Sequence, residues 1–474
     1  MKKKILITAL FLALLAGCNS ASATTTQEVV EEATEEITTE EVVTEETTTE
    51  TVTTNIQTGN TYNLSGDVTE PLVINSNADV KIVLDDVTYT GSESFISIEG
   101  ANSVTLEVNG ESTIEVTGDN DAIYSKDDID ITGSGVLNIT SNSDAIHVND
   151  SLSISDITLV IDSNEDGIDV NNNTTLSNTN ITINTNKDGF NLGKSDNTTA
   201  KHNGDATITN STLNITCADD GIKAYGVIET SNSEIDITSG GGYTNAEEHY
   251  SDMAFGQMGG WKGFGMNGPS TANSSGEINY DTSDSSTDES TRYKGISAKS
   301  LTVVNTNFKL NTQDDAINVN DEFIIESGEM NIQAGDDAIH SDNTITVNGG
   351  NINIETCWEG LEANTITMND GEVYVYALDD GLNANGTSPV IQVNGGTLNV
   401  DMGQGDTDAI DSNGYIYLDG GTININAQSP FDYDTGGRLN SASVTVNGST
   451  VTELTNQFGG MGQGGMNHGH GMRP

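Results

Sequence analysis

Apolar and polar residues alternate along most of the chain from about residue 60 to residue 456. Runs such as 151–155 and 157–163 place Leu or Ile at every second position, with Ser, Thr or Asp at all but one of the positions between them. The runs are rich in β-branched residues, and Asn, Asp or Gly interrupts them every five to eight residues. This pattern predicts short β-strands separated by turns. No stretch of this region shows the period of an amphipathic helix.

A short motif divides these strands into repeats. It consists of an acidic residue, then Ala or Gly, then a large apolar residue, and most copies lie 21 to 23 residues apart. The acids, at what we call position zero, are Asp121, Asp144, Asp166, Asp188, Asp220, Asp315, Asp337, Glu359, Asp380 and Asp408. A fixed period of this size indicates units that bury their apolar faces only by stacking on one another.

The repeat length and composition predict an all-β parallel β-helix over residues 57–456. A coil of about 22 residues holds about three short strands, and each strand lies about 4.8 Å from its equivalent in the next coil. Leucine-rich repeats have a similar length, but they require several leucines at fixed places, and these repeats are rich in isoleucine instead.

One coil is interrupted by a long insertion at 241–292. The position-zero residues on either side, Asp220 and Lys294, lie 74 residues apart where one coil needs about 22. Three aromatic residues of the insertion could offer flat faces to sugar rings: Phe255, Trp261 and Phe264. A surface excursion without function is the other interpretation, and the sequence leaves both open.

The termini indicate export and attachment to a membrane. Residues 1–17 have the charged start and short apolar run of a signal peptide. The segment Leu15-Ala16-Gly17-Cys18 resembles a lipobox, which implies a lipid on Cys18 and a location on the outer face of a bacterial cell membrane. Residues 18–56 are rich in Thr and Glu and predict a disordered spacer, and 457–474 predicts a flexible Gly/Met/His-rich tail.

The net charge of −56, with only 16 Lys and Arg, limits the partners of the chain. Nucleic acid is excluded as a partner, and a membrane is expected to be reached only through the lipid on Cys18. Divalent cations are expected partners. Cys217 and Cys357 are expected to stay unpaired, because four coils would separate them by about 19 Å. We expect a monomer.

Stacked coils place the position-zero acids in a column with about 5 Å between neighbours. Such close like charges require raised pKa values, N–H donors or bound cations. Capping of turns is therefore one interpretation of these acids, and Ca²⁺ binding is the other, where acids from adjacent coils converge. The candidate ligands are Asp144, Glu165, Asp166, Asp169, Asp188, Asp219, Asp220, Asp314, Asp315, Asp336 and Asp337. The expected clusters are Asp144 with Glu165, Asp166 and Asp169, then Asp219 with Asp220, and then Asp314 and Asp315 with Asp336 and Asp337.

Lys294 occupies position zero in place of an acid. We favour its interpretation as a neutraliser of the column. It could alternatively act as a general base that removes the proton α to a uronate carboxylate, and Lys223 is the second candidate for that role.

The repeated motifs, the lipobox with an acidic spacer, and the Gly/Met-rich insertion and tail resemble the bacterial carbohydrate-binding β-helix family founded on a clostridial cellulose-binding protein. The resemblance covers roughly 60–456. It implies a right-handed parallel β-helix that binds calcium, is related to pectate lyases, and binds cellulose and acidic plant-wall polysaccharide. Asp144 followed by Glu165, Asp166 and Asp169 is similar to the acidic pattern of those lyases, whereas their base lysine has no clear counterpart here.

Three functions follow as hypotheses. The favoured one is a cell-surface lipoprotein that binds polysaccharide, cellulose or polygalacturonate, in a calcium-dependent way. The alternatives are a calcium-dependent polysaccharide lyase and a structural or adhesion protein of the cell surface.

Overall fold

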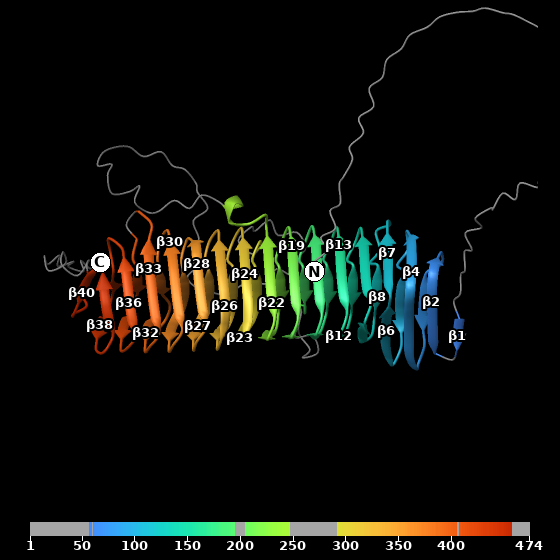
Figure 1. The fold of residues 1–474 in the computed structure, drawn as a ribbon, viewed down its shortest axis with the longest axis horizontal. Coiled ribbons are helices and arrows are strands. Elements are labelled where there is room, and N and C mark those ends of the chain that lie inside the picture. The colour runs from blue at the N-terminus through green and yellow to red at the C-terminus, as the bar shows by residue number, and fades with distance from the viewer. Residues whose placement is uncertain (1–55, 59, 195–203, 247–291, 405–406, 457–474) are drawn as a thin grey trace, which may run out of the picture. The chain divides into compact units, whose positions relative to one another are not determined.

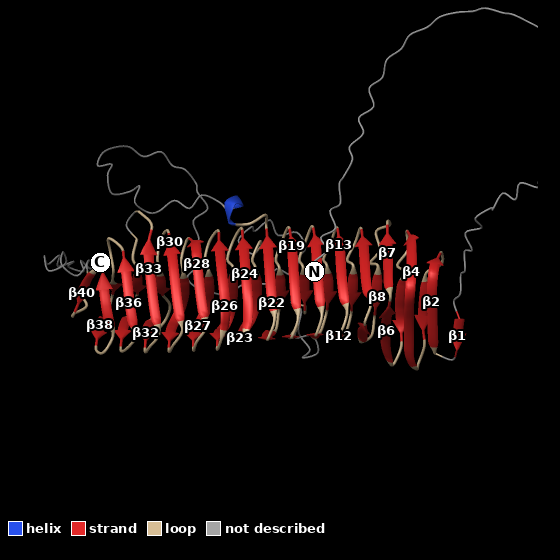
Figure 2. Cartoon of the chain, viewed as in Figure 1, coloured by secondary structure: helices blue, strands red, loops and turns tan. Residues whose placement is uncertain are grey.

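A computed structural model of the chain describes residues 56–58, 60–194, 204–246, 292–404 and 407–456. These residues form a parallel β-helix of about 15 turns (Figure 1). Figure 2 shows that strands dominate, and the described residues contain one short helical element, the 3-10 helix η1 (Tyr243–Asn245). The predicted fold class is confirmed. Among the described residues, no helix is long and apolar enough to cross a bilayer.

Each full coil contributes strands to three walls. The first wall contains β3 (Leu72–Asn75), β5 (Ile96–Gly100), β8 (Ile123–Ser125), β11 (Ile146–Val148), β14 (Ile168–Val170), β17 (Phe190–Leu192), β20 (Ile222–Ala224), the first halves of β23 (Ile296–Val304), β25 (Ile317–Ile325), β27 (Ile339–Val347) and β29 (Leu361–Met368), and β31 (Leu382–Ala384), β34 (Ile410–Ser412) and β37 (Asp432–Tyr433).

The second wall follows the first in each coil. It contains the first halves of β2 (Thr61–Val68) and β4 (Asp79–Gly91), then β6 (Ser103–Asn109), β9 (Ile129–Gly133), β12 (Leu152–Ser155), β15 (Thr174–Ser177), β18 (Ala206–Thr209), β21 (Val227–Ser231), the second halves of β23, β25, β27 and β29, and β32 (Val390–Val393), β35 (Tyr415–Leu418) and β38 (Gly436–Leu439).

The third wall completes the coil. It contains the second halves of β2 and β4, then β7 (Glu111–Val116), β10 (Val136–Ser141), β13 (Thr158–Ser163), β16 (Asn180–Thr185), β19 (Thr212–Cys217), β22 (Glu234–Ser239), β24 (Thr306–Thr312), β26 (Gly328–Ala334), β28 (Asn351–Cys357), β30 (Glu372–Ala377), β33 (Thr397–Met402), β36 (Thr422–Asn426) and β39 (Ser443–Val446).

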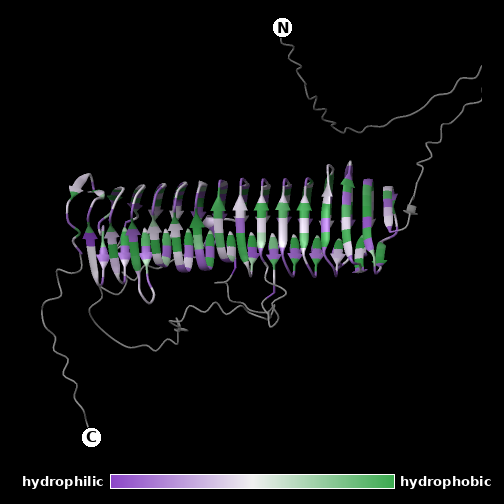
Figure 3. Cartoon of the chain, turned by 90° about the horizontal axis from the view of Figure 1, so that it is seen from below, coloured by the Kyte–Doolittle hydropathy of each residue, from purple (hydrophilic) through white to green (hydrophobic). Residues whose placement is uncertain are grey.

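Apolar side chains stack inside the coils in register. In the first wall, Ile146 pairs with Ile168, and Ile168 pairs with Phe190. All three side chains are buried, while the residues that alternate with them face outward. Figure 3 shows this alternation as hydrophobic and hydrophilic bands along the strands. Each such buried side chain contributes roughly 1.5–3 kcal/mol of hydrophobic free energy. Because successive side chains of a strand point to opposite faces, only every second residue enters the core, which explains the two-residue period of the sequence.

The small residue after each position-zero acid is required by close packing between coils. A Cβ at Gly189 would lie 2.5 Å from the carbonyl oxygen of Gly221 and 2.5 Å from Cγ2 of Ile215. At Gly221 it would lie 2.4 Å from Cγ2 of Ile237. Larger side chains do not fit this corner, which explains why only Gly and Ala occur there.

Both ends of the coil stack are closed by short antiparallel strands. The strand β1 (Ile56–Thr58) pairs antiparallel with β2, and β40 (Ser449–Val451) pairs antiparallel with β39. After β40 the chain returns over the last coil, where Leu454 is buried and its carbonyl accepts a hydrogen bond from the Tyr433 hydroxyl at 3.4 Å.

The described flanks of the insertion meet at the corner before the first wall. The Ser239 hydroxyl donates a hydrogen bond to the carbonyl oxygen of Tyr293 at 2.8 Å. Phe255, Trp261 and Phe264 lie outside the described residues, as do Cys18 and the 457–474 tail. Cys217 and Cys357 are both buried and unpaired, as predicted.

Candidate functional site

The position-zero acids lie in one column along the corner that precedes the first wall. Main-chain hydrogen bonds fix this arrangement, since the N–H of each following residue donates to the carbonyl of the position-zero residue in the next coil. Gly167 donates to Asp188 at 2.9 Å, and Gly189 donates to Asp220 at 2.9 Å. The stacking predicted from the repeat period is therefore present in the structure.

In six of these acids, one carboxylate oxygen caps the backbone of the next coil: Asp144, Asp166, Asp188, Asp220, Asp315 and Asp380. Oδ1 of Asp144 accepts the main-chain N–H of Asp166 at 2.8 Å, and Oδ1 of Asp166 accepts that of Asp188 at 3.0 Å. The same contact joins Asp188 to Asp220 at 2.9 Å and Asp220 to Lys294 at 2.8 Å. A hydrogen bond to a charged acceptor contributes about 1.5–3 kcal/mol, so these acids have a structural role through Oδ1.

A second polar column runs beside the acids, three residues after each of them. Its members face outward from the first wall, because they occupy the middle of its strands between two inward side chains. In register they are Tyr124, His147, Asp169, Asn191, Lys223, Ser297, Asn318, His340, Glu362, Asn383 and Asp411. From the sequence this position is recognisable only as polar, although the constant offset of three residues could have identified the column.

In several acids that cap the next coil, the second oxygen contacts this polar column. Asn191 donates to Oδ2 of Asp166 at 3.0 Å, and Asn318 donates to Oδ2 of Asp315 at 2.7 Å. Oδ1 therefore serves the fold, while Oδ2 is placed toward the outer surface, where it can contact a cation or a ligand.

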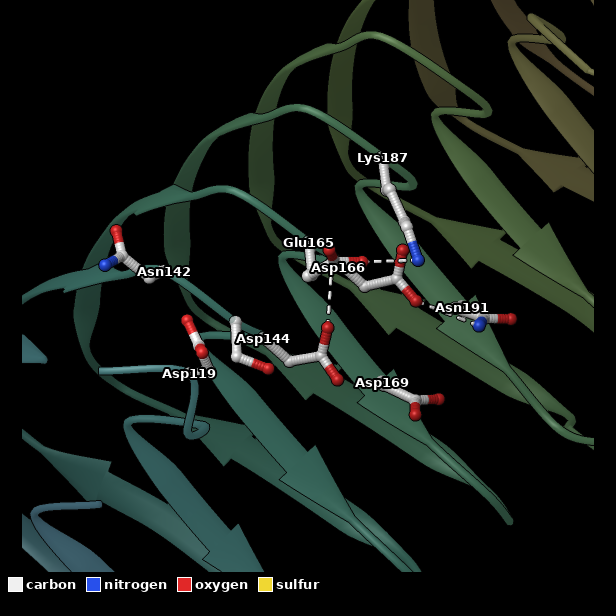
Figure 4. A pocket seen from close by; sticks show the side chains of 9 residues that line it. Asp119, Asn142, Asp144, Glu165, Asp166, Asp169, Lys187 and Asn191 are labelled. Atoms are coloured by element: carbon white, nitrogen blue, oxygen red, sulfur yellow. Dashed lines mark hydrogen bonds and ion pairs between the residues drawn. The ribbon is translucent and has the colours of Figure 1, made fainter. Parts of the chain in front are cut away.

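The acids Asp144, Glu165, Asp166 and Asp169, predicted as one calcium cluster, all line one cavity of about 410 Å³. Figure 4 shows that its side chains come from four successive coils, and dashed lines mark the contacts of Asp166 with Asp144 and with Asn191. The complete lining is Asp119, Asn142, Ser143, Asp144, Glu165, Asp166, Asp169, Lys187 and Asn191. Lys187 forms an ion pair with Glu165 at the exposed side of the cavity.

Two acids that line this cavity, Asp166 and Asp169, have raised pKa values. Burial, followed by the charge of Asp144, raises the pKa of Asp166 to about 6. Burial is also the largest cause for Asp169, whose pKa rises to about 7 despite the nearby His147. A bound cation would offset the repulsion between these carboxylates.

His147 lies at one side of the cavity and was not identified from the sequence. Its Nδ1 is 3.4 Å from Oδ2 of Asp144, 3.4 Å from Oδ2 of Asp169 and 3.5 Å from Oδ2 of Asp121. Burial lowers the pKa of His147, but the hydrogen bond to Asp144 and the charges of Asp169 and Asp121 outweigh burial and raise it to about 9. The imidazolium therefore already balances part of the negative charge.

The predicted cluster of Asp219 and Asp220 also includes Asp188, and it contacts basic side chains of the chain itself. Ligand atoms of Asp188, Asp219 and Asp220 lie within 4.8 Å of one another. Lys223 Nζ lies 3.5 Å from Oδ2 of Asp188, and Arg292 Nε lies 2.9 Å from Oδ2 of Asp219. These cations compete with a metal ion for the same oxygens.

The cluster predicted from Asp314, Asp315, Asp336 and Asp337 divides into two groups. The first three have ligand atoms within 4.8 Å of one another, but Asp337 groups with His340 and Glu362 instead. His340 Nδ1 lies 3.2 Å from Oδ2 of Asp337 and 2.7 Å from Oε2 of Glu362. Asp337 groups in this way because His340, like His147, lies three residues after a position-zero acid, and a histidine at that position contacts the acids beside it.

Neither candidate base has the properties that proton abstraction requires. Lys294 is buried, with Nζ 2.5 Å from Oδ2 of Asp315 and 3.3 Å from Oδ2 of Asp314. Burial lowers its pKa, but these carboxylates outweigh burial and raise the pKa above its usual value, and the pKa of Lys223 is raised in the same way by Asp188 and Asp220. A general base must lose its proton near the working pH, so this geometry favours the neutralising role of Lys294.

Comparison with known proteins assigns a family to the chain. The model of the family described as "Carbohydrate-binding domain-containing protein" matches residues 46–338 and 336–457. No curated protein and no solved structure matches the chain. Because the family model covers most of the sequence, including every coil described above, the chain belongs to the carbohydrate-binding domain-containing protein family.

Proposed function

We propose that the protein binds acidic polysaccharide of the polygalacturonate type through calcium ions held at the acid column. The observation that carries this proposal is the cavity at Asp144, Asp166 and Asp169, where carboxylates from neighbouring coils open onto one space of about 410 Å³. The family of the chain supports a carbohydrate as the ligand.

Calcium is the ion that suits this donor set. Ca²⁺ takes six to eight oxygen ligands in flexible geometry, and the acids supply oxygen donors from more than one coil. A chain with a net charge of −56 repels a polyanion, so direct binding of uronate would be unfavourable. A cation that is only partly coordinated by the protein can accept its remaining ligands from uronate carboxylates. The predicted lipid on Cys18 would hold this binding domain at the outer face of the cell membrane.

The test is a pull-down of the protein with polygalacturonate in the presence of calcium or of EDTA. We expect binding with calcium and none with EDTA, because the ion forms the bridge. The double variant Asp166→Asn/Asp169→Asn should weaken binding at least tenfold, since it removes two charged donors and leaves the Oδ1 cap of Asp166 in place.

The control for this test is Asp130→Asn/Asp162→Asn, which removes the same charge from exposed positions of the second and third walls. Equal loss of binding in both double variants would show that total charge, and not the cavity, is responsible. The formation of unsaturated product, followed by its absorbance, would overturn the proposal in favour of a lyase.

A further inference from the structure

Two tyrosines lie side by side on the outer face of the second wall, near the C-terminal end of the β-helix. Tyr415 and Tyr417 alternate along β35 with the buried Ile416 and Leu418. Their ring centroids are 5.5 Å apart, and the ring planes are inclined by 26°. Tyr415 is 40% exposed, which is unusual for a large side chain of this protein. These rings therefore contribute to the surface and not to the core.

In the next coil, Gly436 leaves space beside the Tyr415 ring, whereas Arg438 packs against the Tyr417 ring. Gly436 is the register partner of Tyr415, and a Cβ placed on it would lie 3.5 Å from Cε1 of the Tyr415 ring. Arg438, the partner of Tyr417, places its guanidinium carbon 3.8 Å from the centre of that ring. Asp419 holds the guanidinium, with Nε to Oδ1 at 2.9 Å. A planar ligand can therefore approach the Tyr415 ring over Gly436.

The two tyrosines are the end of an uncharged strip. In preceding coils, the same two outward positions of the second wall are occupied by Val390 and Gln392, then Thr365 and Thr367, then Thr344 and Thr346. None of these residues is acidic, although the chain has 72 Asp and Glu. From β27 to β35 there are three spacings between coils, so the strip is about 14 Å long.

We propose that this strip is a second binding site, which takes an uncharged polysaccharide chain of pyranose rings. The C–H face of one sugar ring lies on Tyr415 over Gly436, and the ring hydroxyls form hydrogen bonds with the threonine hydroxyls and the Gln392 amide. Aromatic faces and short polar groups are what a neutral sugar requires, because its ring offers apolar C–H surface and polar edges at the same time.

The chemistry of the strip favours a neutral ligand over a uronate. Arg438 is already paired with Asp419, so it offers no free charge to a carboxylate. No carboxylate in the strip would hold a bridging cation. The second segment that matches the family model, residues 336–457, contains the whole strip, which supports a carbohydrate as the occupant. The inference rests on the proposed function only in that the ligand is a polysaccharide, and it does not require calcium.

The experiment measures binding of the protein to insoluble cellulose and to hydroxyethylcellulose, with EDTA present throughout. We expect binding by the unaltered protein and at least a tenfold loss in Tyr415→Ala. The variant Gly436→Leu keeps both rings but fills the space beside Tyr415, so it should lose binding to a similar extent. Thermal unfolding of each variant will show whether it folds as the unaltered protein does.

Tyr376→Ala is the matched control, because Tyr376 is a partly exposed tyrosine on β30 in the third wall. Its binding to both glucans should be unchanged, as should that of Asp166→Asn/Asp169→Asn. If the unaltered protein fails to bind polygalacturonate in calcium but still binds the neutral glucans, the calcium proposal alone would be rejected. Full binding by folded Tyr415→Ala and Gly436→Leu would overturn the strip as the site, as would absence of binding by the unaltered protein. Dimerisation that both variants abolish would identify a second copy of the chain as the occupant instead.

Discussion

At the scale of the residue, an acid of the column can divide its two oxygens between the fold and the surface. Oδ1 of Asp188 accepts a main-chain N–H of the next coil, and Oδ2 faces Lys223. The sequence presented capping and cation binding as alternatives, but the structure shows that one carboxylate can serve the first and remain placed for the second. An asparagine at such a position would preserve the cap and remove the charge.

Asp380 shows how ionisation of a buried acid lowers the stability of the fold. Among the described residues, no basic side chain lies against it. Burial, together with the charges of Asp411 and Asp379, raises its pKa to about 8. Between the usual value of 3.8 and 8, the unfolded chain releases the proton and the folded chain retains it, so stability falls as pH rises through this interval.

We therefore expect Asp380→Asn to stabilise the protein above pH 8 by on the order of 2 kcal/mol, with little effect near pH 4. The Oδ1 acceptor that caps Asp408 at 3.2 Å is retained in asparagine. The measurement is thermal unfolding in EDTA from pH 4 to pH 9, with the exposed Asp130→Asn as control. A gain that is independent of pH would show that the charge of Asp380 is not the cause.

At the scale of the element, packing at the corner before the first wall determines which residues each coil can carry there. The sequence predicted the repeat and its small residue after the acid, because the same packing recurs in every turn. The column at position three could not be predicted to the same extent, since the sequence does not show which neighbouring coil a side chain such as His147 contacts. The same limit applies to Asp337, whose grouping with His340 depends on side-chain direction and not on repeat spacing.

The tight corner yields a prediction for Gly189. Gly189→Val should destabilise the β-helix by about 1–3 kcal/mol, because the added carbons meet the Gly221 carbonyl and the Ile215 side chain. Urea unfolding would measure this loss. Gly100→Ala is a suitable control, since its Cβ would lie no closer than 3.4 Å to its nearest neighbour, Oδ1 of Asn75. Equal stability of the two variants would mean that the corner relaxes to admit a side chain.

At the scale of the whole molecule, repulsion between negative charges opposes the fold. The chain has 72 acidic and 16 basic residues. Many of the described basic side chains are placed against acids, as at Lys294 and Arg292. The column is therefore stabilised by local ion pairs while the surface as a whole repels itself.

This repulsion predicts a strong dependence of stability on salt. Raising NaCl from about 0.01 M to 0.1 M shortens the screening length from about 30 Å to about 10 Å, so the melting temperature should rise. Calcium chloride at equal ionic strength should raise it further, because a bound ion adds its binding free energy to the folded state. A melting temperature that does not change with NaCl would contradict this account of the charge.

The antiparallel strands at the two ends of the coil stack determine whether copies of the protein can associate end to end. A parallel ladder offers each terminal turn as a template for another turn, which is how fibrils elongate. The three-residue strands β1 and β40 reverse the chain direction at both ends, and the segment around Leu454 lies over the last apolar layer. Without these reversals, one copy could continue the walls of another, and the protein would polymerise along its axis instead of remaining a particle of fixed length.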